Sequence, residues 1–251
     1  MMLRPVLRIL AVSACIAALC GPALAADPEC DTPEALTALH AALPRVAQKF
    51  AARQTVTVVA IGSSSTAGAG ASQPGNSYPA KLERLWPRYL PGLQVTVLNM
   101  GRNGEEIPQM LDRFEADVAA SKPDLVLWQL GTNAILRNNG ITGFAKPMQE
   151  GLDRLKSIGA DIVLIDLQYA PLVLRDADHT AMQRMIADAA SHNRIGLFQR
   201  FAIMKHWVES GQMNLAQQIS PDGLHHNDFG YHCLAKGLAR GLADATRKSL
   251  H

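Results

Sequence analysis

The sequence has few aromatic residues and almost no excess of charge of either sign. Phe, Trp and Tyr make up 5% of its 251 residues, and 24 Lys plus Arg stand against 22 Asp plus Glu. Proteins that bind nucleic acid carry basic stripes or aromatic platforms, and neither pattern occurs here. We therefore expect no nucleic-acid partner.

Long apolar runs are also absent, except at the N-terminus. There, Arg4 and Arg8 flank the start of "ILAVSACIAALC", which is followed by the small-residue site Ala23-Leu24-Ala25. This pattern predicts a secretory signal peptide over residues 1–25, cleaved near Ala25, and hence a periplasmic or secreted protein. An uncleaved N-terminal anchor is the alternative. No later run is long enough to span a bilayer, so we expect no membrane span in the mature chain.

The mature chain predicted in this way, residues 26–251, has the length of a single domain. Removal of residues 1–25, which contain two arginines and no acid, lowers Lys plus Arg from 24 to 22, equal to the 22 Asp plus Glu. A formal charge of zero implies no polyanionic partner.

Cysteine is scarce, with four in the whole sequence. Cys15 and Cys20 lie in the predicted signal peptide, which leaves Cys30 and Cys233 in a compartment that should be oxidising. Chain termini often lie close together. We therefore expect an intramolecular disulfide between Cys30 and Cys233.

The chain is rich in short apolar runs in which polarity does not alternate. Such runs are typical of strands that are covered on both faces, as in parallel sheets. They occur at 55–61, 95–98, 125–130, 162–167 and 195–198.

Amphipathic segments separate these runs. Apolar residues repeat with helical spacing in 107–118, 143–158 and 228–245, and a further helix is expected over 31–53, with Asp31 or Thr32 as its N-cap. Alternating strands and helices predict a three-layer α/β/α sandwich around a parallel sheet of about five strands, a flavodoxin-like arrangement. In such folds ligands bind beyond the carboxyl ends of the strands.

Small polar residues follow several of the predicted strands. The stretches are "GSSSTAG" at 62–68, "NMGRNGEE" at 99–106, "GTNAI" at 131–135 and the late loop "SPDGLHHNDFGY" at 220–231. Each one alone is typical of an ordinary turn. Together they contain every group that acyl transfer requires.

A serine hydroxyl attacks an ester only when a base takes its proton and a carboxylate orients that base. Asp222 and His225, three residues apart, can supply the carboxylate and the base. The negative oxygen that forms during the reaction needs hydrogen-bond donors. Gly104, the Asn133 side chain and a backbone N–H at the serine turn are the candidates.

These four stretches resemble the blocks of the SGNH hydrolase family, also called GDSL esterases and lipases, over essentially the whole mature chain. The family's Gly-Asp-Ser-x-Thr block is similar to 62–66 and implies that Ser64 is the nucleophile, with its own N–H in the oxyanion hole. The other three blocks correspond to Asn99 with Gly104, to Gly131-Thr132-Asn133, and to Asp222 with His225.

The chain departs from the family in its first block, where Ser63 stands in place of the aspartate. This substitution removes no member of the triad, but it leaves the register of the nucleophile to Gly62, Thr66 and Gly68. Ser63 or Ser65 as the nucleophile remains an alternative.

Two other classes of protein are alternatives to the serine hydrolase. His225, His226 and Asp222, with Asp228 and His232 close by, are enough ligands for a metal-dependent hydrolase, although their spacing is not that of a metal-binding helix. A non-catalytic protein that binds a glycan or acyl group is the second alternative.

The resemblance implies a serine esterase that works through an acyl-enzyme, without metal or cofactor. Because aromatic residues are scarce and no apolar insertion could form an acyl tunnel, we expect small acyl groups, acetyl above all, on a carbohydrate or related alcohol. A lipase, thioesterase or acyltransferase of the same family is the alternative.

Overall fold

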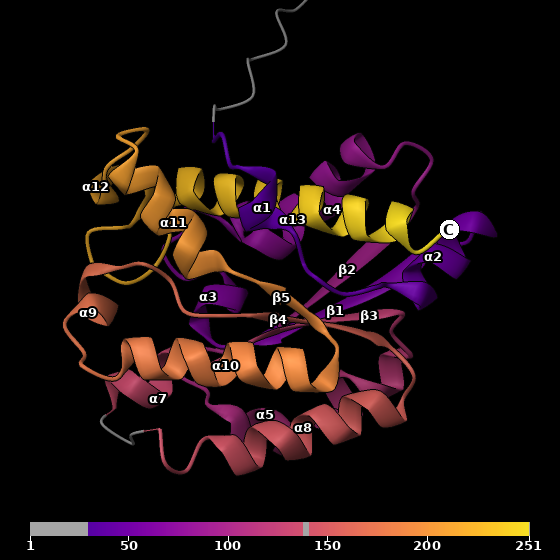
Figure 1. Ribbon diagram of the computed structural model, residues 1–251, viewed down its shortest axis with the longest axis horizontal. Coiled ribbons are helices and arrows are strands. Elements are labelled where there is room, and N and C mark those ends of the chain that lie inside the picture. Colours follow the sequence, from indigo (N-terminus) through magenta and orange to yellow (C-terminus); the bar gives the residue numbers. More distant parts are fainter. Residues whose placement is uncertain (1–29, 138–140, 251) are drawn as a thin grey trace, which may run out of the picture.

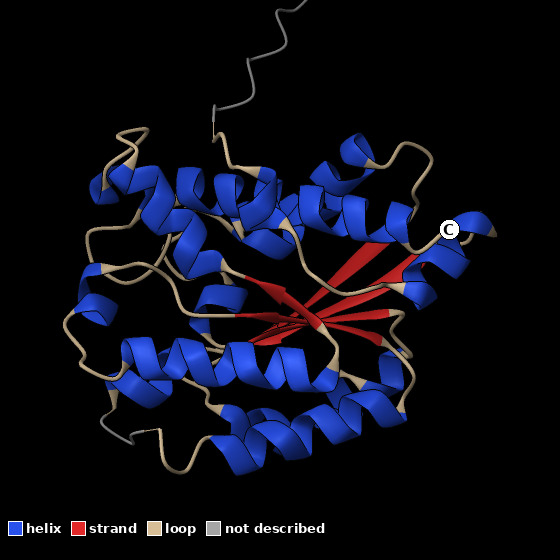
Figure 2. Ribbon diagram, in the orientation of Figure 1, coloured by secondary structure: helices blue, strands red, loops and turns tan. Residues whose placement is uncertain are grey.

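The computed structural model describes residues 30–137 and 141–250. The predicted signal peptide lies outside them. Five parallel strands form one sheet in the order β2-β1-β3-β4-β5, with helices on both of its faces (Figures 1 and 2). The strands are β1 (Val56–Gly62), β2 (Val95–Gly101), β3 (Leu125–Gln129), β4 (Asp161–Ile165) and β5 (Gly196–Phe198).

The helices form the two outer layers of the sandwich. In Figure 1, α4 and α13 lie with α1, α2 and α11 over one face of the sheet, and α5, α8 and α10 lie over the other. The α-helices are α1 (Glu34–Thr37), α2 (Pro44–Ala51), α3 (Ser64–Ala67), α4 (Tyr78–Tyr89), α5 (Ile107–Asp112), α6 (Phe114–Asp117), α7 (Thr132–Leu136), α8 (Ala145–Ser157), α9 (Pro171–Leu174), α10 (His179–Asn193), α11 (Arg200–Glu209), α12 (Leu215–Gln218) and α13 (Asp228–Lys248). Two short 3₁₀ helices, Pro74–Asn76 and Ala119–Ser121, complete the elements.

The predicted fold class is confirmed. The strand order is that of the flavodoxin-like doubly wound sheet, and the three central strands, β1, β3 and β4, are almost entirely buried, as their continuous Val, Ile and Leu runs require. At the edge, β2 is only partly buried. All three tryptophans lie in the core.

Two of the expected helices are each divided into two. The segment 31–53 forms α1 and α2, because Pro44 disfavours helical backbone at Leu43 and His40 adopts a left-handed conformation with φ of 54°. The stripe 107–118 forms α5 and α6, which meet at Arg113, where φ is −107° and ψ is 10°.

Cys30 and Cys233 are joined by a disulfide, with their Cα atoms 5.3 Å apart. The expected pairing is therefore confirmed. In residues 30–137 and 141–250, no helix combines the length and the apolar character that crossing a membrane would require.

Candidate active site

The candidate nucleophile, Ser64, is the first residue of α3, two positions after the end of β1. This turn places its side chain at the carboxyl edge of the sheet, where parallel strands carry their sites. The Oγ atom of Ser64 lies 2.8 Å from Nε2 of His225, across 161 residues of sequence.

The candidate base and its carboxylate lie in the turn between α12 and α13. Nδ1 of His225 is 2.6 Å from Oδ2 of Asp222. An ionised carboxylate can only accept, so Nδ1 carries the proton and Nε2 of neutral His225 is left to accept from Ser64. The other carboxylate oxygen of Asp222 accepts from the backbone N–H groups of Leu224 and His225, at 2.9 and 3.0 Å.

These contacts control the charge of Asp222. Partial burial by itself would raise the pKa of the carboxyl group. The hydrogen bonds from the His225 side chain, from the two backbone N–H groups and from the Ser220 hydroxyl outweigh it and hold the pKa of Asp222 well below its usual range. Asp222 is therefore ionised wherever the site could work.

The candidate oxyanion donors follow β2 and β3. Gly104 adopts φ of +77°, a left-handed conformation that favours glycine, and Nη2 of Arg137 donates to its carbonyl at 2.6 Å. Nδ2 of Asn133, in the first turn of α7, donates to the carbonyl of Glu105 at 2.9 Å. An amide nitrogen has two hydrogens, so the second N–H of Asn133 remains for a substrate oxygen.

Ser63, which stands in place of the family's aspartate, is tied to the neighbouring strand β3. Its backbone N–H and its hydroxyl both donate to Oε1 of Gln129, at 2.9 Å each, and Gln129 is buried. A Cβ atom at Gly62 would collide with the side chains of Thr66 and Gln129. Gln129 is thus a support of the nucleophile turn that sequence reasoning missed.

The other two serines of the triplet are occupied or buried. The Ser63 hydroxyl is bonded to Gln129, and Ser65 is only 2% exposed. The Ser64 hydroxyl contacts the His225 ring at Nε2, whereas the Ser220 hydroxyl donates to the His225 backbone carbonyl at 2.9 Å. The geometry therefore favours Ser64 over its neighbours.

Of the residues of the metal alternative, Asp222 and His225 lie together, but His226 and Asp228 have other partners. His226 is fully buried and packs against the ring of Tyr231 with 5.2 Å between centroids, and burial lowers its pKa to about 3. Asp228 accepts from Ser72 and Asn76 instead. Among residues 30–137 and 141–250, no group of three His, Cys, Asp or Glu side chains is arranged to hold a metal ion.

Arg113 is a further residue that the sequence did not single out. Its guanidinium is 8% exposed and contacts Glu105 at 2.6 Å and Asp117 at 2.7 Å. It also lies 3.5 Å from the carbonyl oxygen of Gly62, so it connects the segment after β2 with the end of β1. Asp117 lies four residues along the chain, the usual spacing of a helical ion pair, but Gly62 is 51 residues away and no local pattern indicates that contact.

Known lipase-like proteins and esterases are similar to this chain. The profile of the Non-GDSL lipase-like family matches residues 29–248. An arylesterase from Vibrio mimicus is 29% identical over 100 residues, which cover 38% of this chain and 50% of the relative. The chain thus spans about half the length of that relative.

Solved structures share the fold. A two-domain esterase active on acetylated mannans superposes with a TM-score of 0.69 and 20% identity, over 84% of this chain and 55% of that one. An acetylxylan esterase from Geobacillus stearothermophilus superposes with a TM-score of 0.60 and 21% identity, over 74% of this chain and 94% of that one.

The profile match covers nearly all of the described chain and so shows the family. The chain belongs to the Non-GDSL lipase-like family. Its fold resembles those of solved acetyl esterases and of a G-D-S-L family protein from Desulfitobacterium hafniense.

Proposed function

We propose that this protein hydrolyses carboxylic esters of small acyl groups, acetyl above all, through a triad of Ser64, His225 and Asp222. The observation that carries the proposal is the continuous hydrogen-bonded chain from Ser64 Oγ to His225 Nε2, at 2.8 Å, and from His225 Nδ1 to Asp222 Oδ2, at 2.6 Å. This is the order of groups that activates a serine.

The reaction takes two steps. His225 accepts the Ser64 proton while Oγ attacks the ester carbonyl carbon, and the resulting oxyanion is held by the N–H groups of Ser64, Gly104 and Asn133. The tetrahedral intermediate collapses, the alcohol leaves with the proton from His225, and Ser64 remains acylated. Water, deprotonated by His225, then releases the carboxylic acid by the same path.

The preference for small acyl groups rests on the space beside the donors. A cavity of about 10 Å³ is lined by residues that include Glu105 and Asn133, and a neighbouring cleft of about 120 Å³ is lined by residues that include Ile107, Ala134 and Phe144. Both are smaller than the roughly 300–1,000 Å³ of sites for drug-sized ligands. Carbohydrate acetates are also the substrates of two structural neighbours, the esterase active on acetylated mannans and the acetylxylan esterase.

We also propose that the protein acts in the periplasm or outside the cell, as a single domain after removal of residues 1–25. The disulfide between Cys30 and Cys233 supports an oxidising compartment. Substrates that depend on cytosolic acyl carriers are then unsuitable.

Labelling with a serine-directed phosphonate tests the class and the nucleophile together. We expect one phosphonate per chain on Ser64, in the presence or absence of EDTA, and loss of both labelling and ester hydrolysis in Ser64→Ala. Ser65→Ala is the matched control and should keep both. Labelling of a different serine would reject the triad, and no labelling would favour a non-catalytic binding protein.

A series of p-nitrophenyl esters from acetate to palmitate tests the substrate. We expect kcat/KM to be highest for the shortest chains and insensitive to EDTA. A steady rise with chain length would indicate a lipase, because each buried methylene contributes about 0.8 kcal/mol. Loss of turnover with EDTA would point to the metal-dependent alternative.

A further inference from the structure

Gln168 lies between the two loops that carry the proposed oxyanion donor and the proposed base. It follows β4, is 1% exposed and belongs to none of the four family blocks. Its side-chain Oε1 accepts from the Thr132 hydroxyl at 2.9 Å, and its Nε2 donates to the carbonyl of Leu224 at 3.3 Å. Thr132 precedes Asn133, and Leu224 precedes His225.

The orientation of the Gln168 amide is fixed by two independent partners. Nη2 of Arg200 lies 2.9 Å from one amide atom, and a guanidinium can only donate, so this atom is the oxygen. The opposite amide atom faces the Leu224 carbonyl, which can only accept, so it is the nitrogen. A flipped amide would lose both contacts.

Arg200 makes this arrangement rigid. It is fully buried at the start of α11, and the same Nη2 also donates to the backbone carbonyl of Asp166 at 2.5 Å. No carboxylate of the described residues forms an ion pair with it. A buried cation is expensive to desolvate, and a hydrogen bond from a charged donor is stronger than a neutral one. The buried charge is thus directed at Gln168 and at the end of β4.

We propose that Gln168, held by Arg200, is a positioning residue that fixes the Thr132–Asn133 and Leu224–His225 segments relative to each other. This inference rests on the proposed function. One amide thereby keeps the oxyanion donor aligned with the base, although the two loops are about ninety residues apart in the sequence. A misplacement of about 1 Å in such a site can lower the rate by about 10²-fold.

Two variants each remove one of the two hydrogen bonds of Gln168, to Thr132 or to Leu224. Thr132→Val keeps volume and branching but removes the hydroxyl that reaches Gln168. Gln168→Glu keeps the oxygens that face Thr132 and Arg200, and replaces the donor to Leu224 with an acceptor. We expect each to lower kcat by about 10- to 100-fold, with KM changed by less than about two-fold.

A matched control separates positioning from stability. Thr246, in α13, is also fully buried and its hydroxyl donates to the Leu242 carbonyl at 2.7 Å. Thr246→Val should lower the melting temperature about as much as Thr132→Val but leave kcat unchanged. Equal losses of kcat in both variants would assign the effect to general loosening of the fold and overturn the proposal.

A double-mutant cycle with Asn133→Ala gives the decisive readout. If Thr132 acts through Asn133, Thr132→Val lowers kcat in the wild type and has almost no further effect once Asn133 is alanine. Gln168→Glu, which disturbs the side of His225, should still lower kcat in that background. The same loss from Thr132→Val in both backgrounds would overturn the positioning role while leaving the triad intact. If Asn133→Ala itself leaves kcat unchanged, this inference fails, while the proposed triad stands or falls separately on the loss of hydrolysis in Ser64→Ala.

Discussion

The three adjacent serines show how much one position along the chain matters. Ser63 ends the turn and gives its hydroxyl to Gln129, Ser64 opens α3 and meets His225, and Ser65 is buried. Ser63 lies in extended backbone before α3, and successive helical residues such as Ser64 and Ser65 point about 100° apart, so these two cannot both face His225. The buried Gln129 side chain fixes Ser63, which stands where the family's first block has aspartate, by accepting from its N–H and its hydroxyl.

The first residue-scale prediction concerns the Asn133 amide. Asn133→Ala should lower kcat by roughly 10²–10³ with little change in KM, because the lost N–H acts on the transition state and not on the bound ester. Steady-state kinetics with p-nitrophenyl acetate measure it. Asn193→Ala, at the C-terminal end of α10, is the control and should keep the wild-type kcat and KM. An effect on KM alone would make Asn133 a substrate-binding residue.

The second residue-scale prediction concerns pH. Only neutral His225 can accept the Ser64 proton, so kcat/KM should fall on acidification along one limb of unit slope. Asp222 adds no second limb, because its hydrogen bonds hold its pKa well below the usual range and it stays ionised there. For the same reason Asp222 contributes stability above its unfolded pKa and loses it as the pH falls through the lower folded value.

The pH profile of Asp222→Asn tests this assignment. An amide can leave His225 in the wrong tautomer, so we expect kcat to fall by about 10²–10⁴ across the whole profile. An acidic limb steeper than unit slope in the wild type, or an unchanged kcat in the variant, would contradict the role given to Asp222.

At the scale of elements, the strands could be predicted and some of the helices could not. Continuous apolar runs identify β1 to β5 to within a few residues, because burial on both faces leaves a strong local pattern. The division of 31–53 depends on Pro44 and His40, and that of 107–118 on the non-helical backbone at Arg113. An amphipathic pattern predicts which face of a helix is buried, but it does not predict where the helix is interrupted.

Only some residues of the candidate site could be predicted from the sequence. Ser64, Gly104, Asn133, Asp222 and His225 could be found because they lie in short blocks that the family shares. Gln129, Gln168 and Arg200 could not, because their partners lie on other elements and only the folded sheet brings them together. Contacts between residues on different elements produce no local pattern that a single sequence could reveal.

The element-scale prediction compares two arginines that share one partner. Arg113 and Arg102 both contact Oδ2 of Asp117, at 2.7 and 2.8 Å, but the Arg113 side chain is 8% exposed and that of Arg102 is 57% exposed. Arg113 lies at the junction of α5 and α6, and Arg113→Ala leaves the carboxylate of Glu105 without its buried partner. This variant should lower the free energy of unfolding by about 3–5 kcal/mol. Arg102→Ala should lower it by less than about 1 kcal/mol. Urea unfolding measures both, and equal effects would show that burial does not set the strength of this network.

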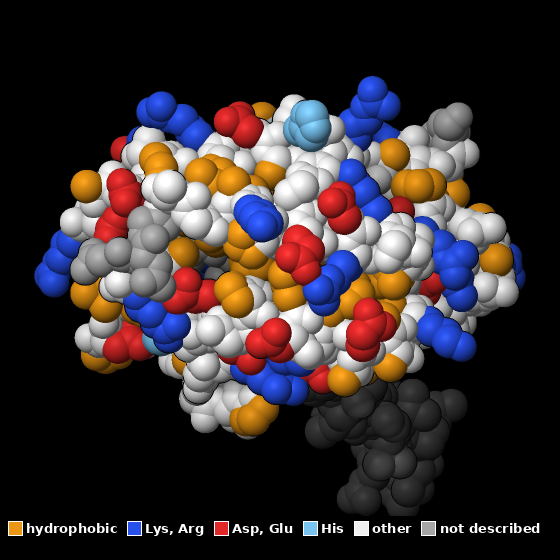
Figure 3. Space-filling view, turned by 90° about the horizontal axis from the view of Figure 1, so that it is seen from below, with side chains coloured by type: hydrophobic (Ala, Val, Ile, Leu, Met, Phe, Trp, Pro, Cys, Tyr) orange, Lys and Arg blue, Asp and Glu red, His pale blue; other side chains and the backbone are white. Residues whose placement is uncertain are grey.

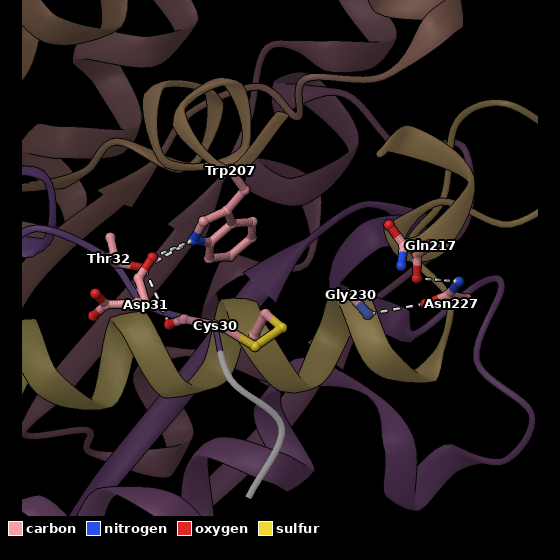
Figure 4. The surroundings of a disulfide bond; sticks show 8 residues. Cys30, Asp31, Thr32, Trp207, Gln217, Asn227 and Gly230 are labelled. Atoms are coloured by element: carbon pink, nitrogen blue, oxygen red, sulfur yellow. Dashed lines mark hydrogen bonds between the residues drawn. A yellow bond between two sulfur atoms is a disulfide. The ribbon is translucent and has the colours of Figure 1, made fainter. Parts of the chain in front are cut away.

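At the scale of the whole molecule, the surface and the termini complete the description. Basic and acidic side chains are interspersed over the face in Figure 3, in keeping with the nearly balanced charge of the sequence. The described chain begins at Cys30, whose segment lies along α13 (Figure 4). Trp207 of α11 donates to the carbonyl of Asp31 at 3.1 Å and to the hydroxyl of Thr32 at 3.0 Å. The segment is thus attached to two helices.

The whole-molecule prediction concerns the covalent part of this attachment. The disulfide joins residues 203 positions apart and so closes nearly the entire described chain. In the chain-entropy model a loop of this length stabilises the folded state by on the order of 5 kcal/mol, because the unfolded chain loses the freedom to separate its ends. Cys30→Ser/Cys233→Ser should therefore shift the urea midpoint strongly downward. The kcat of this variant should match the wild type at low temperature, since the bridge contacts none of the proposed catalytic residues.

Peptide mapping of the unreduced protein tests the bond itself and should recover the two cysteines in one linked pair. Recovery of free thiols, or a variant as stable as the wild type, would show that Trp207 and the helix contacts hold the segment without the bond.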